Sequence, residues 1–205
     1  SASMTAQTAG TVKLKGLGSS ELSLTPRANN YQLPAGTDLA YPPCSAGAKI
    51  ELAADGGGHG AFVLEAECVA PIETPASVMI TKGQALALRW TAGTTSDTRL
   101  HVLLDISQHG TSKGKIECDT DDDGSLDIAP KLVDVLLNLG FSGFPTVVLT
   151  RANESKPATG GSVNVLLNVS APFRAAVEIP GLTSCAADDS QCPAGQICLP
   201  DLKCG

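Results

Sequence analysis

An acidic loop carries the clearest chemistry in this sequence. It reads DTDDDGSLD over residues 119–127 and places carboxylates at its first, third and fifth positions, followed by a glycine. Carboxylates with this spacing converge on one hard cation, and the glycine permits the sharp turn of a calcium loop. We therefore expect a Ca²⁺ site whose ligands are Asp119, Asp121, Asp123 and Asp127.

The alternative for this loop is a turn between two strands with solvated carboxylates. The twelfth position is Pro130, where an EF-hand needs a bidentate glutamate, and the preceding KGKIEC favours a strand, so an EF-hand is excluded. The loop resembles the shorter aspartate-rich calcium loops of extracellular repeat proteins. Asp123-Gly124 is also a strong hairpin signal by itself.

Seven cysteines bear on the cellular compartment. Four of them crowd the last 21 residues: Cys185, Cys192, Cys198 and Cys204. Such density in a short segment indicates disulfides formed in an oxidising environment. The alternative is a zinc site, but zinc knuckles pair cysteines two to four residues apart. No two of these cysteines lie that close, so the spacing favours disulfides.

The segment CAADDSQCPAGQICLPDLKCG resembles a known kind of module. It is similar to the C…D-x-x-CP-x-G-x-x-C…C modules of secreted and envelope-anchored bacterial proteins and of some extracellular animal proteins. The resemblance implies a secreted or cell-surface location, an interaction or spacer role, and no catalysis. Of the three possible connectivities, which all stay open, our first choice pairs Cys185 with Cys198 and Cys192 with Cys204.

Two further cysteines fall on neighbouring expected strands. A hairpin centred on Gly56 sets Ile50 opposite Phe62, and the same register sets Cys44 opposite Cys68 on one apolar face. We therefore expect a Cys44–Cys68 disulfide at the base of this hairpin.

The remaining residues do not form a catalytic motif. Cys118 is left unpaired, and its acidic neighbours would raise the pKa of its thiol, so we expect a buried free thiol rather than a nucleophile. The three histidines lie in turns or on a strand face, and neither G-x-S-x-G nor H-E-x-x-H occurs. We expect a protein that is not an enzyme.

The elements that must position these residues are mostly strands. Apolar residues alternate with polar ones in many short runs separated by Gly, Asp and Asn turns. The pattern predicts an all-β fold, an antiparallel β-sandwich of the Ig-like or jelly-roll-like kind. One short helix should begin at Pro130 and stop at Gly140. We expect a sandwich domain over residues 1–180 and a cysteine-rich disulfide module over residues 181–205.

Charge and composition disfavour two classes of function, nucleic-acid binding and membrane spanning. A net charge of −7 disfavours nucleic acid, and no stretch approaches the 18 apolar residues of a membrane span. No signal peptide is recognisable at the N-terminus, so we expect export to have removed one. We predict a secreted or cell-surface structural and interaction module with protein partners or self-assembly. The alternative is a carbohydrate- or ligand-binding domain, although aromatic residues are few. Asn153 and Asn168 also match glycosylation sequons.

Overall fold

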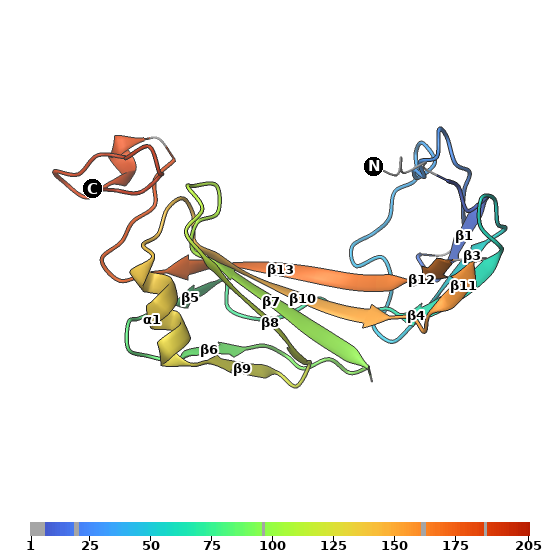
Figure 1. Ribbon diagram of the computed structural model, residues 1–205, viewed down its shortest axis with the longest axis horizontal. Helices are drawn as coiled ribbons and strands as arrows, with labels where there is room; N and C mark the ends of the chain where they lie inside the picture. Colours follow the sequence, from blue (N-terminus) through green and yellow to red (C-terminus); the bar gives the residue numbers. More distant parts are fainter. Residues whose placement is uncertain (1–6, 19–20, 96, 161–162, 187) are drawn as a thin grey trace. The chain divides into compact units, whose positions relative to one another are not determined.

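The computed structural model of the 205-residue chain is mostly β, with one α-helix (Figure 1). It describes residues 7–18, 21–95, 97–160, 163–186 and 188–205. The mostly β, largely antiparallel architecture predicted from alternation is confirmed. The chain divides into two compact units, made of residues Ser1–Ala70, Thr94–Thr98 and Ala152–Ser170 in the first and Pro71–Gly93, Arg99–Arg151 and Ala171–Gly205 in the second.

The first unit contains a four-stranded antiparallel sheet in the order β2-β1-β3-β4. Its strands are β1 (Val12–Lys15), β2 (Leu22–Leu24), β3 (Lys49–Ala54) and β4 (Phe62–Glu67). A small hairpin of β11 (Ala158–Gly160) and β12 (Val163–Val165) belongs to the same unit. Alternate side chains of the sheet are buried, as the period of a strand requires: Val12, Leu22, Ile50, Ala54, Leu64 and Ala66.

The Cys44–Cys68 disulfide is confirmed, but the hairpin register from which it was inferred is wrong. Ile50 lies opposite Ala66 rather than Phe62, four residues further along β4. Cys44 therefore lies outside the ladder, and a turn, in which the Ala48 amide donates to the Ser45 carbonyl at 2.9 Å, precedes β3. The sulfur–sulfur bond joins residues whose Cα atoms are 6.1 Å apart.

The second unit is built on a five-stranded sheet in the order β5-β13-β10-β7-β8. Its strands are β5 (Ser77–Met79), β7 (Thr98–Asp105), β8 (Lys115–Asp121), β10 (Thr146–Glu154) and β13 (Asn168–Glu178). β5 pairs with β13 in parallel, whereas β7 and β8 are antiparallel. The ends of β7, β10 and β13 extend into the first unit.

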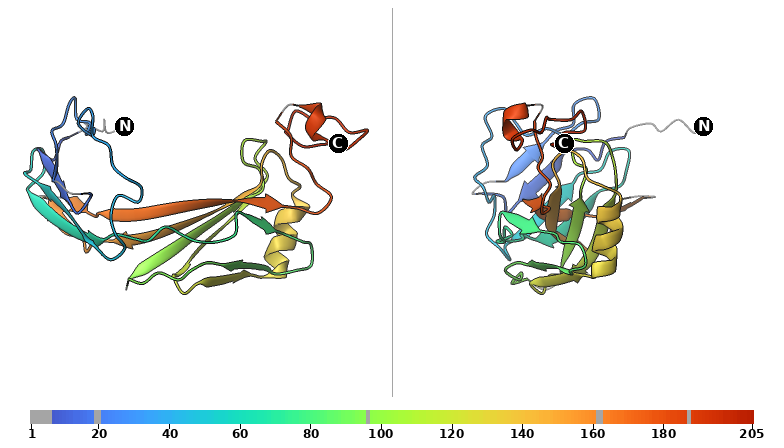
Figure 2. Two further views of the ribbon diagram at one scale, coloured as in Figure 1. Left: turned by 180° about the vertical axis from the view of Figure 1, so that it is seen from behind. Right: turned by 90° about the vertical axis from the view of Figure 1, so that its left-hand side faces the viewer.

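A second layer covers the five-stranded sheet and closes its core. It consists of the antiparallel ribbon β6 (Leu86–Arg89) and β9 (Ser125–Ile128), followed by helix α1 (Pro130–Asn138) (Figures 1 and 2). Fully buried aliphatic side chains of this core come from both layers, among them Leu88, Leu100, Val102, Leu104, Ile106, Val133, Val147 and Leu149.

The helix begins and ends where the sequence indicates. Pro130 occupies its first turn, where the missing amide proton has no intrahelical partner to lose. Gly140 follows the C-cap with a φ of 74°, a left-handed conformation that glycine adopts without a steric penalty. Val133 and Leu136 are buried against the sheet, so the helix covers core.

The cysteine-rich segment contains a single 3₁₀ turn, η1 (Asp189–Gln191), and two crossed disulfides. Cys185 bonds to Cys198 and Cys192 bonds to Cys204, which is the connectivity chosen first. The segment clusters with the second unit, and the Gly143 amide donates to the Asp201 carbonyl at 2.7 Å. This division of the chain differs from the expected boundary near residue 180.

Candidate functional site

Two of the four aspartates expected to bind calcium contact a histidine or an arginine across the β7–β8 ladder. Asp119 lies opposite His101 and contacts its Nδ1 at 2.9 Å. Asp121 lies opposite Arg99 and accepts a hydrogen bond from its guanidinium. Both carboxylates are exposed and are directed along the sheet surface towards β7.

The other two expected ligands are held separately. Asp127 on β9 forms an ion pair with Arg89 of β6 at 2.7 Å. Asp123 accepts the backbone amide of Ser125 at 3.0 Å, which is the usual bond of an aspartate that initiates a turn. Within the described part of the chain, no three of these carboxylates come close enough to share an ion. The structure thus does not assemble the expected ligand set.

The carboxylate between them, Asp122, was not singled out by the spacing, and it is buried. Its side chain is 3% exposed and faces Arg151, which is 2% exposed. Nε of Arg151 donates to Oδ2 at 2.7 Å, and a second guanidinium nitrogen lies 3.1 Å from Oδ1. The indole of Trp90 donates to Oδ1 at 2.8 Å. A buried charge needs such partners, because desolvation penalises an isolated one severely.

This buried cluster ties together three elements of the second unit: the end of the β6 strand region, the acidic loop and β10. There is no room at its rim, since a Cβ added at Gly93 would lie 2.2 Å from Oδ2 of Asp122. A buried charge pair with this many hydrogen bonds is expected to fix the local structure. Its sequence signal is the position of Arg151 on β10, where it shares the inward face with Val147 and Leu149.

The remaining cysteines are one free thiol and a group of disulfide-bonded residues. Cys118 is the free cysteine among the described residues, and it lies in the middle of β8, where it is partly rather than fully buried against the core. Burial, and then the charge of Asp119, raise the pKa of its thiol. The one close group of potential metal ligands in the described residues is formed by Cys185, Cys192 and Cys204, whose sulfurs are bonded in disulfides.

A different surface has the geometry of a binding site: the outer edge of β4. The amide of Cys68, just after β4, donates to the carbonyl of Ala48 at 2.8 Å, and the β3–β4 register continues this alternation along the strand. In an antiparallel pair, successive residues alternate between bonding to the neighbour and pointing away from it. The backbone groups of Val63, Glu65 and Glu67 therefore point away from β3.

One of these three outward positions is already occupied. The Glu67 amide donates to Oδ1 of Asn153 at 2.8 Å, and Asn153 is only 5% exposed. The sequon at Asn153 is therefore buried and engaged in the fold. At Val63 and Glu65 no further strand is paired with the edge of the sheet among the described residues, although β11 lies close to β4.

A groove of about 730 Å³ runs beside this edge. One wall is β4 and the other is the chain from Asn153 to Ala158, which leaves β10 and enters β11. Val63 contributes an aliphatic side chain that is 57% exposed. The volume lies within the usual range for binding sites, and an extended peptide is the ligand that matches an open strand edge.

The exposed face of this sheet carries ion pairs between neighbouring strands, although Glu51 of β3 lies directly opposite Glu65 of β4. Nζ of Lys15 on β1 lies 3.8 Å from Glu21 and 2.7 Å from Glu51 of β3. Nζ of Lys49 on β3 lies 2.7 Å from Glu65 of β4. These hydrogen bonds and charges raise the pKa of both lysines and lower the pKa of Glu51.

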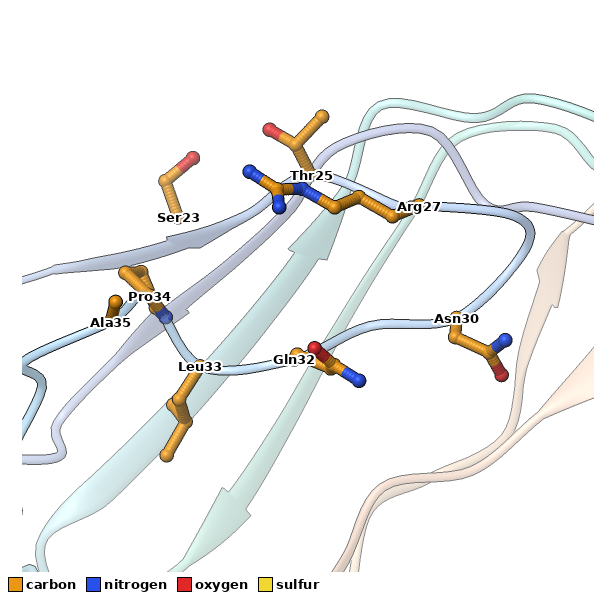
Figure 3. Close-up of a pocket in the computed structure, with 8 residues that line it drawn as sticks. All are labelled: Ser23, Thr25, Arg27, Asn30, Gln32, Leu33, Pro34 and Ala35. Carbon is orange, nitrogen blue, oxygen red and sulfur yellow. The ribbon is translucent and has the colours of Figure 1, made fainter.

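A second concavity of about 360 Å³ lies beside β2, at the opposite edge of the sheet. Figure 3 shows β2 and the following loop as one arm and residues 30–35 as the other, with the side chain of Arg27 extended back along the first arm. Of the eight residues that line it, Arg27 alone is charged, and four are neutral and polar: Ser23, Thr25, Asn30 and Gln32.

The loop that forms this concavity is anchored by Tyr31. Its hydroxyl donates to the Gly10 carbonyl and accepts the Ala9 amide, both at 2.8 Å. A tight turn precedes it, in which Ala28 and Asn29 have φ values of 47° and 65°. The hydrogen bonds of Tyr31 and this turn fix the loop that forms the concavity.

Comparison with protein-family models, characterised proteins and solved structures finds no match for this chain. Among the described residues, no helix has the length and apolar character needed to cross a bilayer.

Proposed function

We propose that the chain is an extracellular or cell-surface interaction module that binds an extended segment of a protein partner at the open edge of β4. The observation that carries this proposal is the row of outward backbone groups at Val63 and Glu65 beside a groove. Strand addition uses such groups directly, since the incoming chain completes the ladder and its side chains provide specificity.

Two observations support the extracellular part of the proposal. Three disulfides staple the chain, and bonds of this kind persist in oxidising compartments. The resemblance of the C-terminal cysteine spacing to modules of secreted and envelope-anchored proteins points to the same location. The raised pKa of the Cys118 thiol argues only against a thiolate nucleophile at this position.

The interaction role is tested by selecting peptides on the intact protein. A phage-displayed library of random linear peptides is panned on the wild-type chain, on Val63→Pro and on Val63→Thr. Proline removes the outward N–H without removing a bond to β3, and such an edge position tolerates proline. Threonine keeps the amide and a β-branched side chain, so it is the matched control.

We expect the selection to yield linear peptides that bind the wild type and Val63→Thr. The same peptides should bind Val63→Pro at least about tenfold more weakly. Circular dichroism of the three proteins verifies that the sheet is retained. Peptides that bind all three proteins equally, or a failure to enrich any peptide on wild type, would overturn the strand-binding role.

A second candidate function is small-ligand binding, including glycans, at the concavity of Arg27. The observation that favours it is one guanidinium beside neutral hydroxyl and amide side chains, a combination that suits a sugar carrying a carboxylate. A glycan array probed with wild type and Arg27→Gln tests it. Binding of uronic acids that is lost in the variant supports the candidate, and binding that is unchanged, or absent from wild type, rejects it.

A further inference from the structure

We infer that the segment that adds to β4 is basic, with Lys or Arg placed to face Glu65 and an aliphatic residue placed to face Val63. This inference rests on the proposed function and specifies the chemistry of its partner. It follows from the pattern of charges on the exposed face of the sheet and from the composition of the groove.

The charge pattern across the sheet ends on an acid at the open edge. The ion pairs run from Glu21 through Lys15 to Glu51, and a separate pair joins Lys49 to Glu65. Each acid thus contacts a base on a neighbouring strand. Glu65 also lies directly opposite Glu51 of β3, so a base on an added strand would offset this like-charge contact.

Glu65 has the exposure to accept such a partner. Its side chain is 49% exposed although Lys49 contacts one of its oxygens at 2.7 Å. A carboxylate has two oxygens and can accept several hydrogen bonds, so a second cation on the outer side does not have to displace the first. Directly opposed residues of unlike charge stabilise a strand pair.

The rest of the groove is also mainly acidic. Its lining includes four acidic residues, Glu65, Glu67, Asp97 and Glu154, against two basic ones, Lys49 and Lys156. The whole chain carries a net charge of −7, which favours association with a cationic segment at low ionic strength. Val63 adds the one large exposed aliphatic surface of β4, at 57% exposure.

The same charges argue against a second copy of this chain as the partner. Two β4 strands paired antiparallel about Glu65 would place that glutamate directly opposite its copy. Like charges in this position destabilise a strand pair, and edge strands use them to prevent self-association. A heterologous basic strand removes this repulsion.

The test uses three fluorescein-labelled peptides that differ only in charge. The first is Thr-Val-Thr-Lys-Thr-Lys-Thr, and the others carry glutamine or glutamate in place of both lysines. Fluorescence anisotropy measures their affinity for the wild-type chain and for Glu65→Gln, Glu65→Lys and Val63→Pro. Glu21→Gln is the matched control, because it removes a carboxylate from the same charge pattern near the opposite edge.

The lysine peptide should bind wild type at least about fivefold tighter than the glutamate peptide, as expected for opposed cross-strand charges. Glu65→Gln should reduce that preference, Glu65→Lys should reverse it, and Glu21→Gln should leave it unchanged. Equal loss in Glu21→Gln would mean attraction to net charge alone and would overturn the inference. So would three peptides of equal affinity, or no binding of the lysine peptide.

These results separate the inference from the proposed function. If the glutamine and glutamate peptides bind as tightly as the lysine peptide, and all three lose affinity on Val63→Pro, the edge binds strands and only the charge rule is wrong. If peptide selection on wild type also yields no binder, the strand-binding role itself is wrong.

Discussion

At the scale of single residues, the most consequential side chain is Asp122. Because it and Arg151 are both nearly inaccessible, removing one partner leaves the other charged and buried. We expect Asp122→Asn to lower the free energy of unfolding by about 3–5 kcal/mol. Urea denaturation at neutral pH measures this loss.

The neighbouring Asp123 is the matched control for that experiment. It is held by the Ser125 amide in an exposed turn, so Asp123→Asn should cost no more than about 1 kcal/mol. Equal losses in the two variants would contradict a clamp centred on Asp122. Replacing both members of the buried pair with apolar residues should recover part of the loss, since no charge then stays buried.

Calcium binding by the acidic loop stays a prediction. The carboxylates of the loop already have partners, which compete with an ion. Asp121 and Asp127 would have to leave Arg99 and Arg89 to reach a shared ion. We therefore expect about 2 mM CaCl₂, enough for extracellular modules, to shift the unfolding temperature by less than about 1 °C relative to EDTA. A larger shift that Asp121→Asn abolishes would establish a calcium site instead.

At the scale of elements, the disulfide at the base of β3 and β4 secures the sheet that carries the groove. It closes a loop between residues 24 positions apart. Chain-entropy arguments give such a bond about 3 kcal/mol of stabilisation. We expect the double variant Cys44→Ala/Cys68→Ala to lose about that amount in urea unfolding, and a variant as stable as wild type would contradict this role.

Sequence periodicity predicted the strand faces better than the strand register. The expected and observed registers of β3 and β4 differ by four residues, an even shift, so every side chain keeps its face. The error lies in the glycine-rich turn, where the Gly56 amide donates to the Ala9 carbonyl at 2.9 Å and the Gly58 amide to the Thr8 carbonyl at 2.9 Å. Local sequence does not report such long-range anchors.

The sequence predicted the candidate site less well than it predicted the fold. Spacing drew attention to alternate aspartates of the acidic loop, whereas the inward-facing one is Asp122, whose partner Arg151 is 29 residues away. The open edge of β4 depends on which strand lies beside it, and that is a property of topology. The cysteine pairings could be predicted from the sequence, because strand parity and motif spacing constrain them.

At the scale of the whole molecule, one chain forms two compact units whose segments interleave in sequence. The expected boundary near residue 180 follows a change in composition. The observed division follows contacts instead, because residues 94–98 and 152–170 group with the first unit. Binding at β4 concerns the first unit alone, whereas the cysteine-rich segment belongs to the second.

The backbone amides of β4 test the strand-binding edge most directly. Hydrogen exchange followed by NMR on the unmodified protein should show fast exchange at Val63 and Glu65 and protection at Leu64, Ala66 and Glu67. The first two amides face the groove, and the others bond to β3 or to Asn153. Adding the lysine peptide should then protect Val63 and Glu65. Uniform protection of all five amides in the free protein would contradict an open edge at β4.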